Sequence, residues 1–175
     1  MALLNIETQS YTTLSKEKNF EIRHYPEAIL ATVHTQGRSY RAVASSGFRQ
    51  LANFIFGGNE RSSRIAMTAP VHMEFDSAGS SMSFVMPSAY KSEDLPKPLN
   101  GRVKIEKFKE QHVAAIRFGG FAGDSRIHSY ENKLKKMLDA KGISYSGNFR
   151  YLGYNSPYRL IGRRNEIIVP VAWKA

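Results

Sequence analysis

The chain has 175 residues, of which 42% are hydrophobic and 23% charged, enough to bury the core of one domain. It contains no cysteine, which excludes a disulfide framework, a zinc–thiolate site and a cysteine nucleophile. Its 25 lysines and arginines exceed its 15 acidic residues, so the formal net charge is +10 and anionic partners are favoured. The basic residues are scattered, without an RNA-binding aromatic signature or a helix-turn-helix pattern, so we expect no nucleic-acid partner. No window approaches the ~18 apolar residues of a membrane span and no signal-peptide pattern is present, so we expect a cytoplasmic protein.

The first predicted elements are two short strands. Residues 20–25 alternate apolar and polar and place His24 on the same face as apolar neighbours. Residues 28–34 follow as a second strand. Pro26 and Glu27 lie between the two strands, and a turn at these two residues predicts a hairpin.

A helix is predicted from about residue 40 to residue 56. Ser39 is placed to cap it, and two glycines follow its end. Its apolar stripe has helical spacing and comprises Ala44, Phe48, Leu51 and Ile55. Residues 64–75 then alternate as a strand that carries Met67 and Met73 toward the core, and residues 82–87 form another strand.

The second half repeats this order. Its predicted strands are 103–108, 111–118, 148–154 and 166–172. The first two again indicate a hairpin, and a helix follows that Asp124 or Ser125 can cap and that Gly142 ends. An offset of 83 residues aligns the halves, for example Ile22 with Ile105.

Two units of this size cannot each close a core. We therefore expect one domain over residues 1–175, in which halves 19–88 and 102–172 pair through their sheets about a pseudo-twofold axis. The polar loop 88–101 joins them.

The two predicted helices differ in a way that suggests a site. The second carries several lysines and reads as solvated, whereas the first carries Arg49 and Asn53, with Phe54 and Phe56 on its exposed side. An apolar stripe with exposed aromatics and an arginine can form the floor of a shallow groove for an amphipathic ligand. The alternative is that both phenylalanines pack under neighbouring loops.

Five segments, in order along the chain, resemble the SOUL/haem-binding protein family. They are EIRHY (21–25), FGGN (56–59), RIAMTAPV (64–71), FGGFA (118–122) and GYNSPYRLIGRRNEI (153–167). The resemblance implies an α+β fold, a distorted antiparallel β-barrel of about eight strands flanked by two helices and built from a duplicated half. A more remote likeness links this fold to GyrI-like effector-binding domains.

The same resemblance implies binding of a tetrapyrrole, either haem or its iron-free precursor. In one branch of the family the ligand lies in a groove over the first helix, and the matching positions here are Arg49, Asn53 and Phe54, with Arg159 near the propionates. In the other branch a histidine in the EIRHY segment is the proposed axial iron ligand, and that position is His24. Arginines suit propionates and an apolar helix face suits the macrocycle. A strand histidine on an apolar face equally fits a packed, hydrogen-bonded role.

Catalytic patterns are weak. Neither a G-x-S-x-G elbow nor an H-E-x-x-H helix occurs. The glycine-rich run 119–123 reads as a tight strand-to-helix turn rather than a phosphate loop. Glu166 is a possible general base, but a carboxylate beside Arg163 and Arg164 is more simply an ion pair, which would keep its pKa too low for a base near neutrality.

Three hypotheses follow. The first is a non-catalytic tetrapyrrole-binding protein that carries, buffers or senses haem, with a monomer favoured. The second is a GyrI-like small-molecule binder or hydrolase that uses Glu166 in a cleft between the halves. The third is a protein–protein adaptor that presents its first helix to a partner.

Overall fold

A computed structural model describes residues 5–76, 78–156 and 159–174. Its main feature is a nine-stranded sheet with the order β2-β3-β9-β11-β10-β6-β7-β4-β8, in which every pairing is antiparallel. The strands are β2 (Thr12–Lys16), β3 (Glu21–Tyr25), β4 (Ala28–Thr35), β6 (Val71–Asp76), β7 (Gly79–Val85), β8 (Val103–Phe108), β9 (Gln111–Phe118), β10 (Arg150–Gly153) and β11 (Asn165–Pro170). Two short strands, β1 (Glu7–Thr8) and β5 (Thr68–Ala69), form a separate parallel pair.

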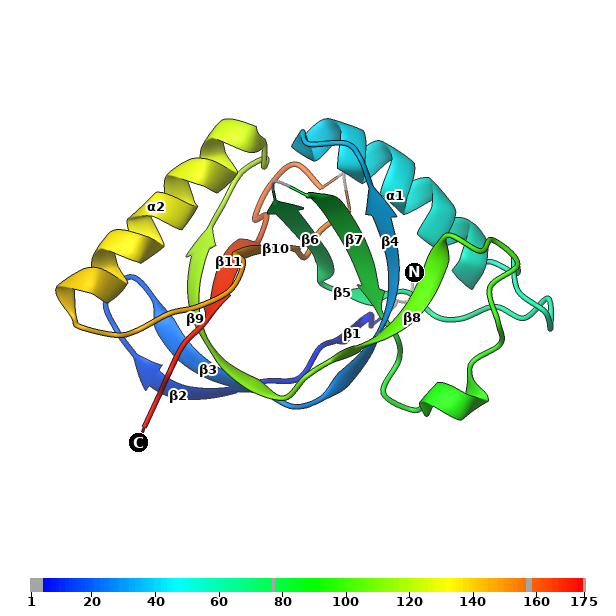
Figure 1. Ribbon diagram of the computed structural model, residues 1–175, viewed down its shortest axis with the longest axis horizontal. Coiled ribbons are helices and arrows are strands. Elements are labelled where there is room, and N and C mark those ends of the chain that lie inside the picture. Colours follow the sequence, from blue (N-terminus) through cyan, green and yellow to red (C-terminus); the bar gives the residue numbers. More distant parts are fainter. Residues whose placement is uncertain (1–4, 77, 157–158, 175) are drawn as a thin grey trace.

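The sheet curls into a half-barrel, and two helices lie against its outer face, one on each side (Figure 1). Helix α1 (Tyr40–Ile55) packs on β4, β7 and β8, and helix α2 (Asp124–Ala140) packs on β9 and β11. A 3-10 turn, η1 (Ser92–Asp94), lies in the segment between β7 and β8. The predicted α+β class and the curled antiparallel sheet with two flanking helices are confirmed, although the expected barrel of about eight strands is a half-barrel with nine strands in its main sheet.

Both predicted hairpins are wrong. Strand β3 pairs with β9, and β4 pairs with β8, so each short strand crosses to the other half of the sheet. The register runs without a shift from Glu21↔Ala115 to Val33↔Val103, with two residues on each strand between the paired segments. The β3–β4 and β8–β9 segments are thus two long, bent strands lying side by side, as the lower part of Figure 1 shows.

The reason is the chemistry of the connecting residues. Two-residue hairpin turns need positive φ at one or both central positions, which proline cannot adopt. Pro26 instead continues the extended chain and only interrupts the hydrogen-bond ladder. A true hairpin joins β6 to β7, where Gly79 has φ +142°.

The order of elements is the same in the two parts of the chain. The series β3, β4, α1, β6, β7 is followed by the series β8, β9, α2, β10, β11. In the sheet the strands of the two series are interleaved symmetrically. From β3 inward the order is β3, β9, β11, β10, and from β8 inward it is β8, β4, β7, β6, so each strand takes the place of its counterpart in the other series. The 83-residue offset holds for β4 and β9 but not for β7 and β11, which are separated by 86 residues at their first residues.

The helix starts differ from each other. Ser39 caps α1 as predicted, because its side chain accepts a hydrogen bond from the Ala42 amide. Helix α2 begins after Gly123, without a side-chain cap. Asp124 instead accepts a hydrogen bond from the Tyr40 amide at 2.8 Å. The expected cap of α2 therefore serves the first turn of α1, and it ties the starts of the two helices together.

Candidate functional site

Helix α1 is rotated relative to the sequence prediction. Its core-facing residues are Val43, Gly47, Leu51, Phe54 and Ile55. Phe54 is only 1% exposed, so its predicted place on the exposed side of the helix was wrong, whereas Phe48 of the apolar stripe is 44% exposed. The cause is Gly47: a Cβ there would lie 2.9 Å from the Cβ of Met82 on β7. The glycine lets the helix backbone approach the sheet at that point, which turns Phe48 to the edge of the contact.

The outward side of α1 has a mixed character. Arg49, Asn53 and Phe56 are exposed and recur at spacings of four and three residues, so they share one helix face. Phe56 is 54% exposed, with the Arg64 guanidinium 5.4 Å from its ring centroid. Phe48 lies beside this face, its ring 5.5 Å from that of Phe84. We call Phe48, Arg49, Asn53 and Phe56 the outer face of α1.

The loop between β10 and β11 carries Arg159. This side chain is exposed, and its Nε donates to the Ile161 carbonyl at 3.0 Å. The loop follows β10, whose Tyr151 packs its ring 5.6 Å from Tyr40 in the first turn of α1. The end of this loop is tied to the segment before α2 by Asn165, which donates to the Gly120 carbonyl, and Asp124 at the start of α2 accepts from the Tyr40 amide at the start of α1. Arg49 lies nine residues further along α1 than Tyr40, about 14 Å at the helical rise per residue.

His24 lies elsewhere. It is on β3, at the lower left of Figure 1, whereas α1 is at the upper right. Its Nε2 is 2.7 Å from Glu110 Oε1, and its ring stands edge-on to His112 at 5.6 Å. The side chain is 29% exposed. A carboxylate on one ring nitrogen can orient a metal-binding histidine through the other, but it is also the arrangement of a simple surface pair.

The structure thus separates the predicted residues into different places. Arg49 and Asn53 share a helix face, Arg159 is in the loop between β10 and β11, Phe54 is in the core beneath α1, and His24 is on a remote strand. Across residues 5–76, 78–156 and 159–174, no group of three or more histidine, aspartate or glutamate side chains is arranged to hold a metal ion. Nor does any helix in the described part of the chain have the length and apolarity needed to cross a bilayer.

Two cavities lie away from α1. One of about 240 Å³ is lined by the ends of β4, β6 and β7, including His34 and Glu74. The other, of about 380 Å³, lies between the N-terminal segment near Gln9, the β3–β4 crossing and the end of β7.

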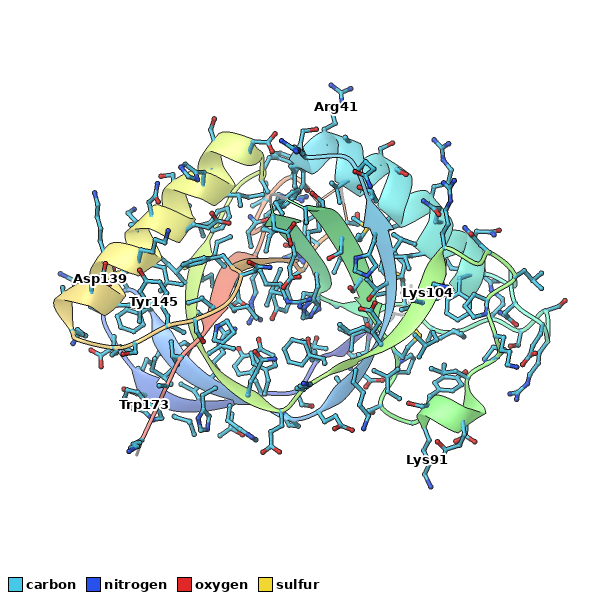
Figure 2. The ribbon with its side chains drawn as sticks, in the orientation of Figure 1. Arg41, Lys91, Lys104, Asp139, Tyr145 and Trp173 are labelled. Carbon is cyan, nitrogen blue, oxygen red and sulfur yellow. The ribbon has the colours of Figure 1, made fainter. Side chains whose placement is uncertain are left out.

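The concave side of the sheet is filled by side chains, as Figure 2 shows. On this side Arg23 and Glu166, 2% and 0% exposed, are joined by two hydrogen bonds of 2.7 and 2.6 Å. Arg164 adds a contact to Glu166 at 3.1 Å and donates to the Tyr11 hydroxyl. Arg23 also donates to Glu21 and to the Tyr25 hydroxyl.

The sequence pointed to only part of this network. The predicted pairing of Glu166 with Arg164 is confirmed, but Arg163 instead donates to the carbonyls of Ser156 and Arg159. The partnership with Arg23 was missed, since nothing local connects residues so distant in the chain. The sequence did contain one signal for it. Successive side chains of a strand point to opposite faces of the sheet, so Arg23, next to the core residue Ile22, must project from the face opposite to the helices.

The electrostatics argue against acid–base chemistry at this position. Burial alone would raise the pKa of Glu166, but hydrogen bonds and charge from Arg23, with help from Arg164, outweigh it and leave the pKa below its ordinary value. Burial also raises the pKa of the neighbouring Tyr25 to about 12. Glu166 therefore stays ionised near neutral pH and is not poised to take up a proton.

This architecture defines a class of protein: a curled antiparallel half-barrel with one helix on each flank, the fold of the GyrI-like proteins. The C-terminal domain of EcmrR has it, with a TM-score of 0.69, 12% identity, and coverage of 93% of this chain and 98% of that one. A hydrolase from Listeria innocua shares it with a TM-score of 0.61, 13% identity, and coverage of 91% and 94%. At these identities the likeness shows the fold alone.

The sequence narrows the class to a family. The model of the SOUL heme-binding protein family matches residues 6–170. Heme-binding protein 2 of Homo sapiens is 32% identical over 156 residues, which cover 85% of this chain and 76% of that protein. The chain belongs to the SOUL heme-binding protein family.

Proposed function

We propose that the chain is a non-catalytic tetrapyrrole-binding protein that takes haem or an iron-free porphyrin on the outer face of α1. The observation that carries the proposal is the composition of that face in a chain of this family. A tetrapyrrole needs an apolar surface for its ring and cations for its two propionates. Phe48 and Phe56 are exposed beside Arg49 on one helix, which supplies both.

Phe54 has a different role in this proposal from the one the resemblance implied. It lies under the helix in the core and holds α1 on the sheet, while Phe56 takes its place as the aromatic contact. Arg159 serves a propionate that extends toward the start of α1. His24 is too remote to ligate iron in a haem bound there, so the proposal expects weak or absent axial ligation.

Family members named as heme-binding support the ligand class, and the buried Glu166 pair weighs against the hydrolase alternative. We further propose that the protein acts in the cytoplasm as a monomer, and that it serves as a carrier, buffer or sensor of its ligand. The adaptor alternative uses the same outer face of α1, and it differs in expecting that face to bind a protein and no haem.

The test is a haemin titration followed by absorbance. Wild-type protein is expected to give a saturable Soret shift at one ligand per chain, and Arg49→Glu with Arg159→Glu is expected to weaken binding by at least about tenfold. The control, Lys91→Glu with Lys136→Glu, makes the same change in charge at exposed positions elsewhere. If both double variants bind haemin equally, the site is not on α1.

A second variant locates the iron. His24→Ala is expected to leave the spectrum and the affinity unchanged. A loss of the Soret shift in His24→Ala, with Arg49→Glu and Arg159→Glu unaffected, would move the site to β3 and overturn the proposal.

A further inference from the structure

Two adjacent aliphatic side chains stand out of the loop between β10 and β11. Leu160 is 74% exposed and Ile161 is 86% exposed, more than any other large hydrophobic residue in the described part of the chain. Exposed apolar groups gathered in one place and bordered by polar residues are typical of interaction sites. The tetrapyrrole proposal makes no use of either residue.

The loop presents these residues from a folded turn. The Arg163 guanidinium donates to the carbonyls of Ser156 and Arg159, both at 2.8 Å. Arg159 donates in turn to the Ile161 carbonyl, and Gly162 has a φ of +66°, which reverses the chain after the two aliphatic residues. Their side chains are therefore turned to solvent by backbone geometry, with hydrogen bonds fixing the turn behind them.

A second loop extends the exposed apolar surface. Phe121, between β9 and α2, is 52% exposed, and the Arg163 guanidinium lies 4.5 Å from its ring centroid. Asn165 at the start of β11 donates to the Gly120 carbonyl at 2.8 Å, which ties the two loops together. We call Phe121, Leu160 and Ile161 the apolar tip.

The surroundings of the apolar tip are basic. Arg159 and Arg163 flank it within its own loop, and Arg126 donates to the Gly119 carbonyl on the side of Phe121. Residues 159–164 contain no acidic side chain, and Asp124, in the neighbouring segment, is hydrogen-bonded to the Tyr40 amide. Arg164 is excluded from this set because its guanidinium turns inward to Glu166.

Apolar side chains at a loop tip, ringed by cations, fit one kind of surface best. The acyl boundary of a bilayer accepts small apolar insertions, and anionic headgroups attract the arginines around them. A net charge of +10 adds a long-range attraction to such a surface. The area of three side chains is small for a stable protein–protein interface, which favours the lipid surface over a protein partner.

We propose that the apolar tip docks the protein on an anionic membrane surface. Leu160, Ile161 and Phe121 enter the interfacial region, while the exposed Arg126 and Arg159 meet lipid phosphates. This activity goes beyond tetrapyrrole binding and does not require it, because the tip is exposed without a ligand.

The test uses the full chain without haem and measures its co-sedimentation with vesicles. Binding is expected to phosphatidylcholine vesicles that contain phosphatidylserine, to be much weaker with phosphatidylcholine alone, and to fall as salt rises. Leu160→Ser with Ile161→Ser is expected to weaken binding by about tenfold. Leu99→Ser is the matched control, since Leu99 is 71% exposed at a different loop, and it is expected to bind as wild type does.

Each contrary outcome overturns the proposal. They are an absence of binding to anionic vesicles, equal binding to neutral ones, and equal behaviour of the Leu160/Ile161 and Leu99 variants. A thermal unfolding curve for each variant guards against misfolding. A haemin titration of the same proteins is read separately, so a failure to bind haem leaves the vesicle result standing.

Discussion

Arg23 and Glu166, separated by 143 residues in sequence, face each other across the concave side of the sheet with two hydrogen bonds and almost no exposure. They lie on β3 and β11, strands that are joined only through β9. Both side chains project to the concave side of the sheet, where the two charged groups are buried against each other.

Breaking this pair is expected to be costly. Glu166→Gln leaves the Arg23 charge buried with weakened compensation, and the free energy of unfolding should fall by about 3–5 kcal/mol in urea at neutral pH. Arg23→Met with Glu166→Leu removes both charges and should recover most of that loss. Glu27→Gln, at the exposed pair with Lys107, is the control and should change stability by less than about 1 kcal/mol. A double variant as unstable as Glu166→Gln would contradict this account.

His72 predicts a pH dependence of stability. It is fully buried, and burial followed by the charge of Arg150 lowers its pKa well below the ordinary value. The unfolded chain takes up a proton at His72 near its ordinary pKa, while the folded chain does not. Stability is therefore retained above about pH 6.5 and falls below it, by up to about 1.4 kcal/mol per pH unit.

The measurement is urea unfolding at intervals from about pH 8 to about pH 5. His72→Gln should flatten the curve, whatever it costs at neutral pH. His128→Gln, at a side chain that is 75% exposed, should keep the wild-type slope. Parallel curves for wild type and His72→Gln would show that His72 is not the source of the dependence.

The two phenylalanines at the end of α1 should separate stability from binding. Phe54→Ala opens a cavity in the core and should lower the free energy of unfolding by about 3–5 kcal/mol. Phe56→Ala removes an exposed ring and should change stability by no more than about 1 kcal/mol, while weakening haemin binding. Equal losses of stability in the two variants would contradict the burial of Phe54 and the exposure of Phe56 on α1.

Local signals predicted the local structure well. Ser39, the apolar spacing and the glycines after Phe56 gave α1 its bounds, expected at 40–56 and observed at Tyr40–Ile55. The strand patterns likewise located β4 and β9 closely. These features depend on residues near each other in sequence, which is where propensity and periodicity carry information.

The incorrect or missed predictions concern contacts between residues that are distant in sequence. Pro26 argues locally against a two-residue hairpin turn, but the strands that pair with β3 and β4 come from the other half of the chain, and no local pattern identifies them. The face of α1 that packs on the sheet depends on the close approach of Gly47 to Met82 on β7. The apolar spacing within the helix gives no information about that contact. The Arg23–Glu166 pair was hidden for the same reason.

The site residues were predicted from the resemblance to a family, because no periodicity or spacing in the sequence marks a tetrapyrrole contact. Arg49 and Asn53 share an exposed face, which suits a ligand on α1. Their contact with a tetrapyrrole stays a prediction until a titration is made.

The exchange of strands between the halves has a consequence for how the chain folds. Strand β3 pairs with β9, and β4 pairs with β8, so neither half of the chain can complete its sheet from its own residues. Loops of many tens of residues have to close before these pairings form, which makes folding slow compared with a chain of local hairpins. During synthesis the first half would emerge with unpaired strand edges that only the second half can cover, a stage at which the nascent chain is most exposed to aggregation.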